Sequence, residues 1–186
     1  MEREPQKKGL REYDLGLTNS IILADLLDIE KLFRLNPHWF IDELVEEHGD
    51  FSARLRDYVS DREFRLRGRY SAAADRLRLD FEDGPLRSLS LFFRGGKLHG
   101  TLELRDAGAD EECEHYTLLW LRGIREYLRL YRVNTPARRF FRFIMNRMVL
   151  RMNPSQRKIC LMLIRLTLVE IVVILVIVVG YVVFVL

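Results

Sequence analysis

The chain has 186 residues, 48% of them apolar, which is enough for one compact domain with an appendage but not for two full domains. Its formal net charge is +3, but the charges are unevenly distributed along the chain. Residues up to Leu121 include 18 basic and 25 acidic side chains, whereas the later residues include 12 basic and 2 acidic ones. The two parts therefore carry net charges of −7 and +10, and the basic part predicts a polyanionic partner, either a nucleic acid or an anionic membrane surface.

The first predicted elements are a strand, a helical segment and a second strand. The charged start of the chain, MEREPQKKGLRE, lacks an apolar region, so we expect no secretory signal peptide. A short strand is predicted near residues 13–17. Residues 20–35 are predicted as a helix that is capped by Asn19 or Ser20 and ends before an Asn-Pro pair. A strand near residues 40–47 follows.

Residues 51–105 alternate between apolar and polar side chains, which is the pattern of half-buried strands. Leu77, Leu79 and Phe81, for example, alternate with charged residues. The Gly95-Gly96 pair predicts a tight hairpin, and the sequence Glu-Asp-Gly-Pro at residues 82–85 predicts another turn. Because the predicted strands are about ten residues apart, we expect an antiparallel meander with one dry face.

A long helix is predicted after the strands. Its apolar residues follow helical spacing and form one wide face: Tyr116, Leu119, Trp120, Ile124, Tyr127, Leu128 and Tyr131. This face is large enough to close the open side of a curved sheet.

The order of these elements, the stretch FRLNPHWF after the first helical segment and the stretch HYTLLWLRGIREYL in the long helix resemble the helix-grip superfamily of START-like and polyketide-cyclase-like (SRPBCC) domains. The resemblance covers residues 10–132. It implies an α+β fold in which a curved antiparallel sheet of about seven strands surrounds a long C-terminal helix. It also implies a cavity for lipids, sterols, quinones or other apolar ligands, and many members of the superfamily are not enzymes.

Six aromatic side chains are expected to face the space between the sheet and the long helix: Phe64, Tyr70, Phe81, Phe93, Trp120 and Tyr127. One interpretation is that they line a pocket for a flat or long apolar ligand. The alternative is that they fill the core, because a domain of this size needs many large apolar residues. The sequence leaves both open.

Catalytic and metal-binding motifs are not found in the sequence. His38, His48, His99 and His115 lack metal-ligand spacing, and the only cysteines, Cys113 and Cys160, form no CxxC pair. The acidic run of residues 42–47 is interpreted as a solvated face. We therefore expect no catalytic residue, no metal and no cofactor, although a cyclase-type or dehydratase-type enzyme is not excluded.

Residues 135–158 contain seven basic side chains and no acidic one. Thr135 and Pro136 suit the cap and first position of a helix, and Asn153-Pro154 would end it. Phe140, Ile144, Met148 and Met152 form an apolar stripe, opposite a cluster of Arg138, Arg139, Arg142 and Asn146. We interpret this segment as an amphipathic helix at a membrane surface. The residues predicted to face the headgroups are Arg138, Arg139, Arg142, Arg147 and Arg151.

The last 26 residues are apolar except for Arg165, Thr167 and Glu170. As a helix they would extend about 39 Å, enough to cross a bilayer. Arg165 then lies near one interface, whereas Glu170 lies roughly 6 Å inside the hydrocarbon. Glu170 is either protonated or reaching toward headgroups, or it contacts another transmembrane helix. Both charges are therefore candidates for docking within the membrane.

Three segments are predicted: a cytoplasmic helix-grip-like domain at residues 1–132, a basic interfacial helix at 133–154 and a C-terminal single-pass anchor at 155–186. The adjacent span favours membrane lipids over nucleic acid as the partner of the arginines. The leading hypothesis is a non-enzymatic domain, tethered at the cytoplasmic membrane face, that binds a lipid, quinone or similar molecule. The alternative is an accessory subunit of a larger membrane complex, docked through Glu170. An excess of Arg (25) over Lys (5) favours a GC-rich bacterial origin.

Overall fold

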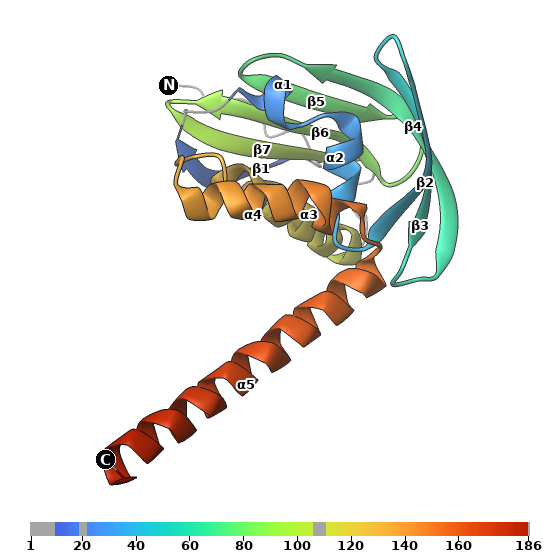
Figure 1. The fold of residues 1–186 in the computed structure, drawn as a ribbon. Coiled ribbons are helices and arrows are strands. Elements are labelled where there is room, and N and C mark those ends of the chain that lie inside the picture. The colour runs from blue at the N-terminus through green and yellow to red at the C-terminus, as the bar shows by residue number, and fades with distance from the viewer. Residues whose placement is uncertain (1–9, 19–21, 106–110, 186) are drawn as a thin grey trace. The chain divides into compact units, whose positions relative to one another are not determined.

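The computed structural model describes residues 10–18, 22–105 and 111–185. It divides into two compact units, Met1–Arg151 and Met152–Leu186 (Figure 1). The first unit contains all of the strands and most of the helices. The second consists mainly of one long helix.

Seven antiparallel strands form one sheet in the order β1-β7-β6-β5-β4-β3-β2. After β1, every strand pairs with the next one along the chain, and β7 returns to pair with β1, as the predicted meander requires. The strands are β1 (Leu10–Thr18), β2 (Trp39–Glu47), β3 (Asp50–Asp57), β4 (Arg62–Ala72), β5 (Arg76–Phe81), β6 (Leu86–Arg94) and β7 (Lys97–Leu104). The predicted seven-stranded antiparallel sheet is confirmed.

The alternating pattern decides which face of the sheet is buried. On β5, Leu77, Leu79 and Phe81 are buried, whereas Arg76 and Arg78 are exposed. The β6–β7 hairpin turns at Gly95 and Gly96, with φ angles of +57° and +76°, and the flanking residues Arg94 and Lys97 pair with each other. Two successive positive φ angles are typical of the tight hairpin turn that a Gly-Gly pair favours.

The helical segment between β1 and β2 differs from the single helix predicted over residues 20–35. It consists of two short helices, α1 (Leu23–Leu26) and α2 (Ile29–Arg34), with extended backbone at Leu27. The break arises because Asp28 caps α2: its side-chain oxygen accepts a hydrogen bond from the backbone nitrogen of Lys31 at 2.7 Å. The predicted cap at residues 19 and 20 lies outside the described residues.

The long helix α3 (Glu111–Arg129) packs its predicted apolar face on the sheet. Trp120, Ile124, Tyr127 and Leu128 on this face are buried. The indole nitrogen of Trp120 donates a hydrogen bond to the carbonyl oxygen of Leu32 at 2.7 Å, which ties α3 to α2. The sheet, α2 and α3 therefore share one core.

Three further helical elements follow α3: α4 (Pro136–Arg147), the 3-10 turn η1 (Val149–Arg151) and α5 (Pro154–Val185). Thr135 caps α4 as predicted, because its hydroxyl oxygen accepts from the backbone nitrogen of Arg138 at 3.3 Å. The α-helix ends at Arg147 rather than at the predicted Asn153-Pro154 break. Leu150 on η1 is buried, and its carbonyl oxygen accepts a hydrogen bond from the Arg34 guanidinium at 3.0 Å, so the folded domain extends well past residue 132.

Candidate functional site

An aromatic cluster surrounds Trp120 in the core between the sheet and the helices α2 and α3. We call this part of the core the inner layer. The Trp120 ring is 6.1 Å from the ring of Phe33, 6.5 Å from that of Phe81 and 5.2 Å from that of Trp39, measured between centroids. Centroid separations in this range are those of rings in direct contact. The rings come from α2, β2, β5 and α3, so the cluster joins both helices to the sheet.

The six aromatic residues predicted to face this layer occupy different places in it. Phe81 and Trp120 belong to the central cluster, and Phe64 joins it through Trp39, at a ring distance of 5.6 Å. Phe93 packs against the core near the β6–β7 hairpin, opposite Leu98.

Tyr70 and Tyr127 lie against helices. The Tyr70 hydroxyl donates to the backbone carbonyl of Leu27 at 2.6 Å, beside α1 and α2. Its burial, together with the nearby negative charges of Asp28 and Glu46, raises the pKa of Tyr70 to about 12. The Tyr127 hydroxyl is directed toward α4. The structure thus brings three of the predicted residues into one cluster and places the other three at its periphery.

Phe33, Trp39 and Phe51 complete the cluster, and none of them was among the predicted site residues. The ring of Phe51 is 5.4 Å from that of Phe33 and 6.0 Å from that of Phe81. The only signal for Trp39 in the sequence is its place in the FRLNPHWF stretch that supports the family resemblance. For Phe33 the signal is its position on the apolar face of the first helical segment.

The interior of this layer is closely packed. Leu77, Leu79, Leu89 and Leu91 have no solvent-accessible surface. A side chain without accessible surface borders no void large enough for a water molecule. The same holds for Phe33 at the centre of the aromatic cluster, which also has no accessible surface.

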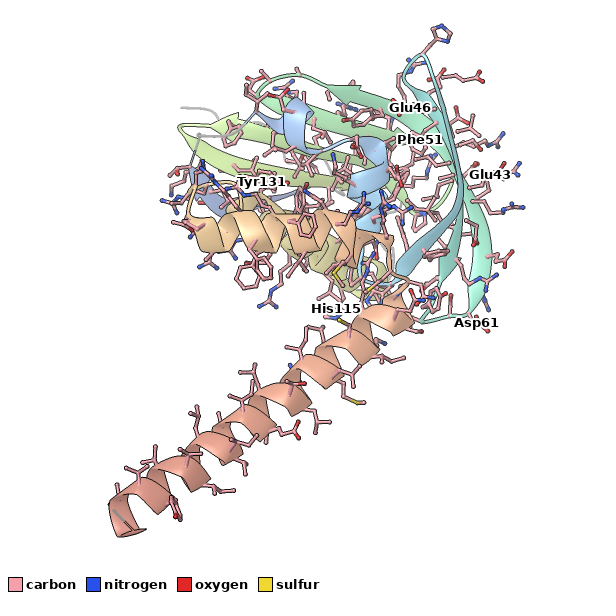
Figure 2. The ribbon with its side chains drawn as sticks, viewed as in Figure 1. Glu43, Glu46, Phe51, Asp61, His115 and Tyr131 are labelled. Carbon is pink, nitrogen blue, oxygen red and sulfur yellow. The ribbon has the colours of Figure 1, made fainter. Side chains whose placement is uncertain are left out.

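A second cluster joins α3 to α4. The Tyr127 hydroxyl donates to the side-chain oxygen of Asn146 at 3.0 Å and lies 3.1 Å from the Tyr131 hydroxyl, and the Asn146 amide nitrogen donates to Tyr131 at 2.8 Å. Figure 2 shows Tyr131 beside α4. Burial of the Tyr127 phenol raises its pKa far above the ordinary value. These three side chains fix α4 against the C-terminal half of α3.

The predicted membrane-facing arginines divide into two groups. Arg138 donates to the backbone carbonyl of Arg129 at 3.4 Å, and the Arg142 guanidinium lies 5.1 Å from the Tyr131 ring centroid. Arg139 and Arg142 also donate to the Asn134 side chain, at 3.0 and 2.8 Å. Arg147 and Arg151 are exposed. The cluster of Arg138, Arg142 and Asn146 therefore contacts the domain itself.

The opposite side of α4 presents phenylalanines to the solvent. Phe140, Phe141 and Phe143 have 60%, 56% and 61% of their surface exposed. Phe140 and Phe141 contact each other edge to face at a ring distance of 6.1 Å. Burial of a phenylalanine is worth about 1.5–3 kcal/mol, so three exposed neighbours form an unusual surface.

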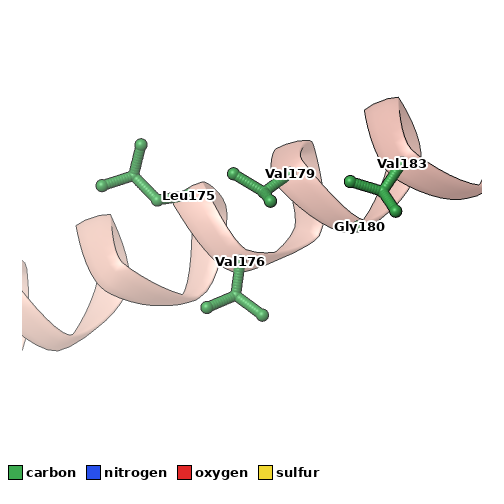
Figure 3. A pocket seen from close by; sticks show the side chains of 5 residues that line it. All are labelled: Leu175, Val176, Val179, Gly180 and Val183. Atoms are coloured by element: carbon green, nitrogen blue, oxygen red, sulfur yellow. The ribbon is translucent and has the colours of Figure 1, made fainter. Parts of the chain in front are cut away.

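In the described part of the chain, one helix is long and apolar enough to cross a membrane. It is α5, whose candidate span is Pro154–Val183; an 18-residue window of this span has a mean hydropathy of 2.9, and none of that window is buried. Arg165 and Glu170 are both exposed on it. A shallow hollow beside Gly180 is lined only by residues of the same helix, which makes it a feature of the helix surface (Figure 3). The helix predicted as an anchor is therefore present.

The acidic and histidine side chains that could take part in catalysis or metal binding lie mainly on the surface of the protein. Within residues 10–18, 22–105 and 111–185, no group of three or more His, Cys, Asp or Glu side chains could hold a metal ion. In the acidic run on β2, Glu43 pairs with Arg54 at 3.2 Å, whereas Glu46 lies opposite Phe51 in the β2–β3 register, on the same face of the sheet as Phe51 (Figure 2). His99 pairs with Glu12 at 3.0 Å on the sheet.

No protein-family model matches the chain, and no curated protein matches it. Similar solved structures include an AHSA1-like protein from Aeromonas hydrophila, with 11% identity, a TM-score of 0.40 and coverage of 64% of this chain and 90% of that one. A protein from Chromobacterium violaceum has 16% identity, a TM-score of 0.42 and coverage of 63% and 95%. A polyketide-cyclase-like protein from Corynebacterium glutamicum has 14% identity, a TM-score of 0.33 and coverage of 68% and 90%.

The order of elements gives the fold directly. One strand, two short helices, six further antiparallel strands and a long helix packed on the inner face of the sheet follow one another along the chain. This is the helix-grip fold that the resemblance to START-like and polyketide-cyclase-like domains implied, here followed by α4 and the long apolar helix α5.

Proposed function

We propose that this chain is a non-enzymatic helix-grip domain that is anchored in a membrane by α5 and binds an apolar molecule of that membrane, such as a lipid or a quinone. The observation that carries the proposal is α5 itself. Its candidate span covers 30 residues, and an 18-residue window of that span has a mean hydropathy of 2.9 with none of the window buried in the protein. Exposure of so much apolar surface to water is unfavourable, whereas a bilayer removes it from water.

The inner layer of the domain supports binding rather than catalysis. The indole nitrogen of Trp120 and the hydroxyl of Tyr70 each donate to a backbone carbonyl, of Leu32 and Leu27 respectively. Both polar groups therefore form hydrogen bonds that stabilise the position of α2 and of the residues between α1 and α2. Most of the remaining side chains of the layer are apolar, chiefly leucine and phenylalanine, and apolar side chains suit an apolar ligand.

A ligand would enter by displacing α1 and α2. These helices have four and six residues, and Leu23 and Phe33 on them and Leu27 between them are buried in the core. Short elements open at a lower free-energy cost than long strands and helices. Because the layer is packed without a ligand, binding would replace contacts of α1 and α2 with contacts to the ligand.

The basic residues before α5 support a cytoplasmic position for the domain. Seven basic and no acidic side chains lie in residues 135–158, next to the start of the span. Basic residues that flank a transmembrane helix favour the cytoplasmic side.

The experiment is mass spectrometry of small molecules released from the complete chain after purification in mild detergent. The matched control is residues 152–186 fused to an unrelated soluble protein, which carries only the lipids that α5 retains. The proposal expects an apolar molecule in near-stoichiometric amount with the complete chain and absent from the fusion. Identical extracts from both proteins would refute ligand binding by the domain.

A second candidate is an accessory subunit of a membrane complex, and Glu170 favours it. This carboxylate lies within the candidate span and is exposed on α5, and a charged group inside a bilayer is costly unless it has a partner. A partner helix would supply that contact. Native electrophoresis in mild detergent tests the idea: a larger assembly that is lost in Glu170→Leu but retained in Val169→Leu supports docking, and a monomer in the unmodified chain contradicts it.

A further inference from the structure

The helix α4 packs on the domain with a mixed side, on which Met145 lies against the core, and it leaves three phenylalanines outside. Its polar side chains Arg142 and Asn146 contact Tyr131 of the domain. Its phenylalanines 140, 141 and 143 are each more than half exposed. An amphipathic helix normally buries its apolar side against the core and leaves its polar side in water. The exposed phenylalanines therefore require another explanation.

The connection to α5 limits where these phenylalanines can lie. Leu150 is buried in the domain, and α5 begins at Pro154. Four residue steps separate them, which span at most about 14 Å of extended chain. If α5 crosses a bilayer, its N-terminal end lies at the membrane interface, and the domain is held within that short distance of the same interface.

The charges around α4 suit an anionic lipid surface. Arg147 and Arg151 are exposed at the end of α4 and on η1, and Lys158 is exposed near the start of α5. The sequence contains no Asp or Glu between Thr135 and Lys158 that would repel lipid phosphates. Exposed aromatic side chains combined with basic residues are typical of helices that lie in a membrane interface.

We propose that Phe140, Phe141 and Phe143 insert into the interfacial region of the membrane that α5 crosses. The helix α4 is then a second membrane contact, which holds the domain against the bilayer while Arg147 and Arg151 bind lipid phosphates. The partner is a lipid surface rather than a protein. This inference rests on the proposed anchoring by α5, but not on ligand binding by the domain.

The side chains that meet the lipid in this proposal are not the same as those expected from the sequence. The sequence pattern assigned the headgroup contacts to five arginines: Arg138, Arg139, Arg142, Arg147 and Arg151. In the structure Arg138 and Arg142 contact the domain, so the groups left for the lipid are the phenylalanines, the exposed Arg139 and the later arginines, Arg147 and Arg151.

The test compares two positions on the complete chain in vesicles of phosphatidylcholine and phosphatidylglycerol. After Cys113→Ser and Cys160→Ser, a single cysteine is introduced as Phe141→Cys or, as the matched control, as Val59→Cys, which replaces a 52% exposed residue between β3 and β4. Each cysteine carries an environment-sensitive fluorophore. Lipids that are spin-labelled near the headgroup quench the fluorophore only when it lies in the interface.

The inference expects a blue-shifted emission at position 141 and its loss on addition of the spin-labelled lipids, with neither change at position 59. Flotation of the vesicles reports separately on the anchor. If both proteins float and position 141 remains unquenched, insertion by α4 is refuted and the anchor stands. If neither protein floats, the anchoring and the inference both fail.

Discussion

The hydroxyl group of Tyr127 on α3 donates a hydrogen bond to the side-chain oxygen of Asn146 on α4 at 3.0 Å. The Asn146 amide nitrogen in turn donates to Tyr131 at 2.8 Å. One asparagine thus uses both ends of its amide to hold Tyr127 on α3 and Tyr131 just after the end of α3. The contact turns the polar side of α4 toward the domain, and the outward position of the phenylalanines follows from it.

The first prediction concerns this contact. Asn146→Ala removes both hydrogen bonds, and we expect a loss of about 1 kcal/mol in the free energy of unfolding together with faster amide exchange in α4. The measurement is urea unfolding and hydrogen exchange of the complete chain in detergent. Arg147→Ala, at the exposed neighbouring position, is the control and should change neither quantity. Equal effects of the two replacements would mean that Asn146 does not fix α4.

The second prediction concerns Gly123 on α3, which passes close to the end of α2. An added Cβ atom would lie 2.5 Å from the carbonyl oxygen of Leu35, which is too close for a real contact. Gly123→Ala should therefore force α3 away from α2 and weaken the Trp120–Leu32 hydrogen bond, at a cost of roughly 1–3 kcal/mol. Alanine otherwise favours a helix by about 1 kcal/mol over glycine, so the sign of the change is informative.

Thermal unfolding measures this change. Arg122→Ala, which replaces an exposed residue of the same helix, serves as the control and should stay within about 0.5 kcal/mol of the unmodified protein. Stabilisation by Gly123→Ala would show that α2 and α3 are further apart than the structure places them.

The strands and their order could be predicted from the sequence because apolar and polar residues alternate along each strand, and the apolar ones mark its buried side. Leu77, Leu79 and Phe81 are an example, and the glycines at 95 and 96 marked the hairpin. The break at Leu27 and Asp28 could not be predicted in this way. The apolar spacing continues through it, and the capping bond of Asp28 competes with helix continuation only once the tertiary contacts are formed.

The orientation of α4 shows a different limit. Helical spacing separates the phenylalanines from Arg142 and Asn146, but it does not say which side meets the domain. That choice depends on Tyr127 and Asn146, which are 19 residues apart in the sequence and on different helices. The same holds for the aromatic cluster, in which Phe33 and Trp39 meet Trp120 from distant segments.

The third prediction concerns alkaline pH. Burial raises the pKa of Tyr70 from its ordinary value of 10.0 to about 12, so the folded protein holds this proton more tightly than the unfolded chain does. The stability contributed by neutral Tyr70 is therefore fully present below about pH 10 and is lost as the pH rises toward 12. The free energy of unfolding should fall across this range, and less steeply in Tyr70→Phe.

Equilibrium urea unfolding at a series of alkaline pH values measures this slope. Tyr58→Phe, at a half-buried tyrosine after β3, is the control for loss of a hydroxyl. A slope that is the same in Tyr70→Phe and in the unmodified chain would show that the Tyr70 phenol is not held neutral by the fold.

The last prediction concerns the anchor. Val178 lies in the middle of the uninterrupted apolar run between Glu170 and the end of α5. An arginine near the centre of a membrane-spanning helix costs about 2.5–3.5 kcal/mol in insertion free energy. Val178→Arg should therefore reduce the fraction of the chain that stays in the membrane pellet after extraction with alkaline carbonate. Val178→Leu changes the side chain without adding charge and should leave that fraction unchanged.

Because folding of the domain does not depend on a side chain exposed on α5, soluble Val178→Arg protein should keep the circular dichroism of the sheet. If the unmodified chain already leaves the pellet, or if arginine and leucine behave alike, α5 does not reside in hydrocarbon and the membrane-based proposals fail together.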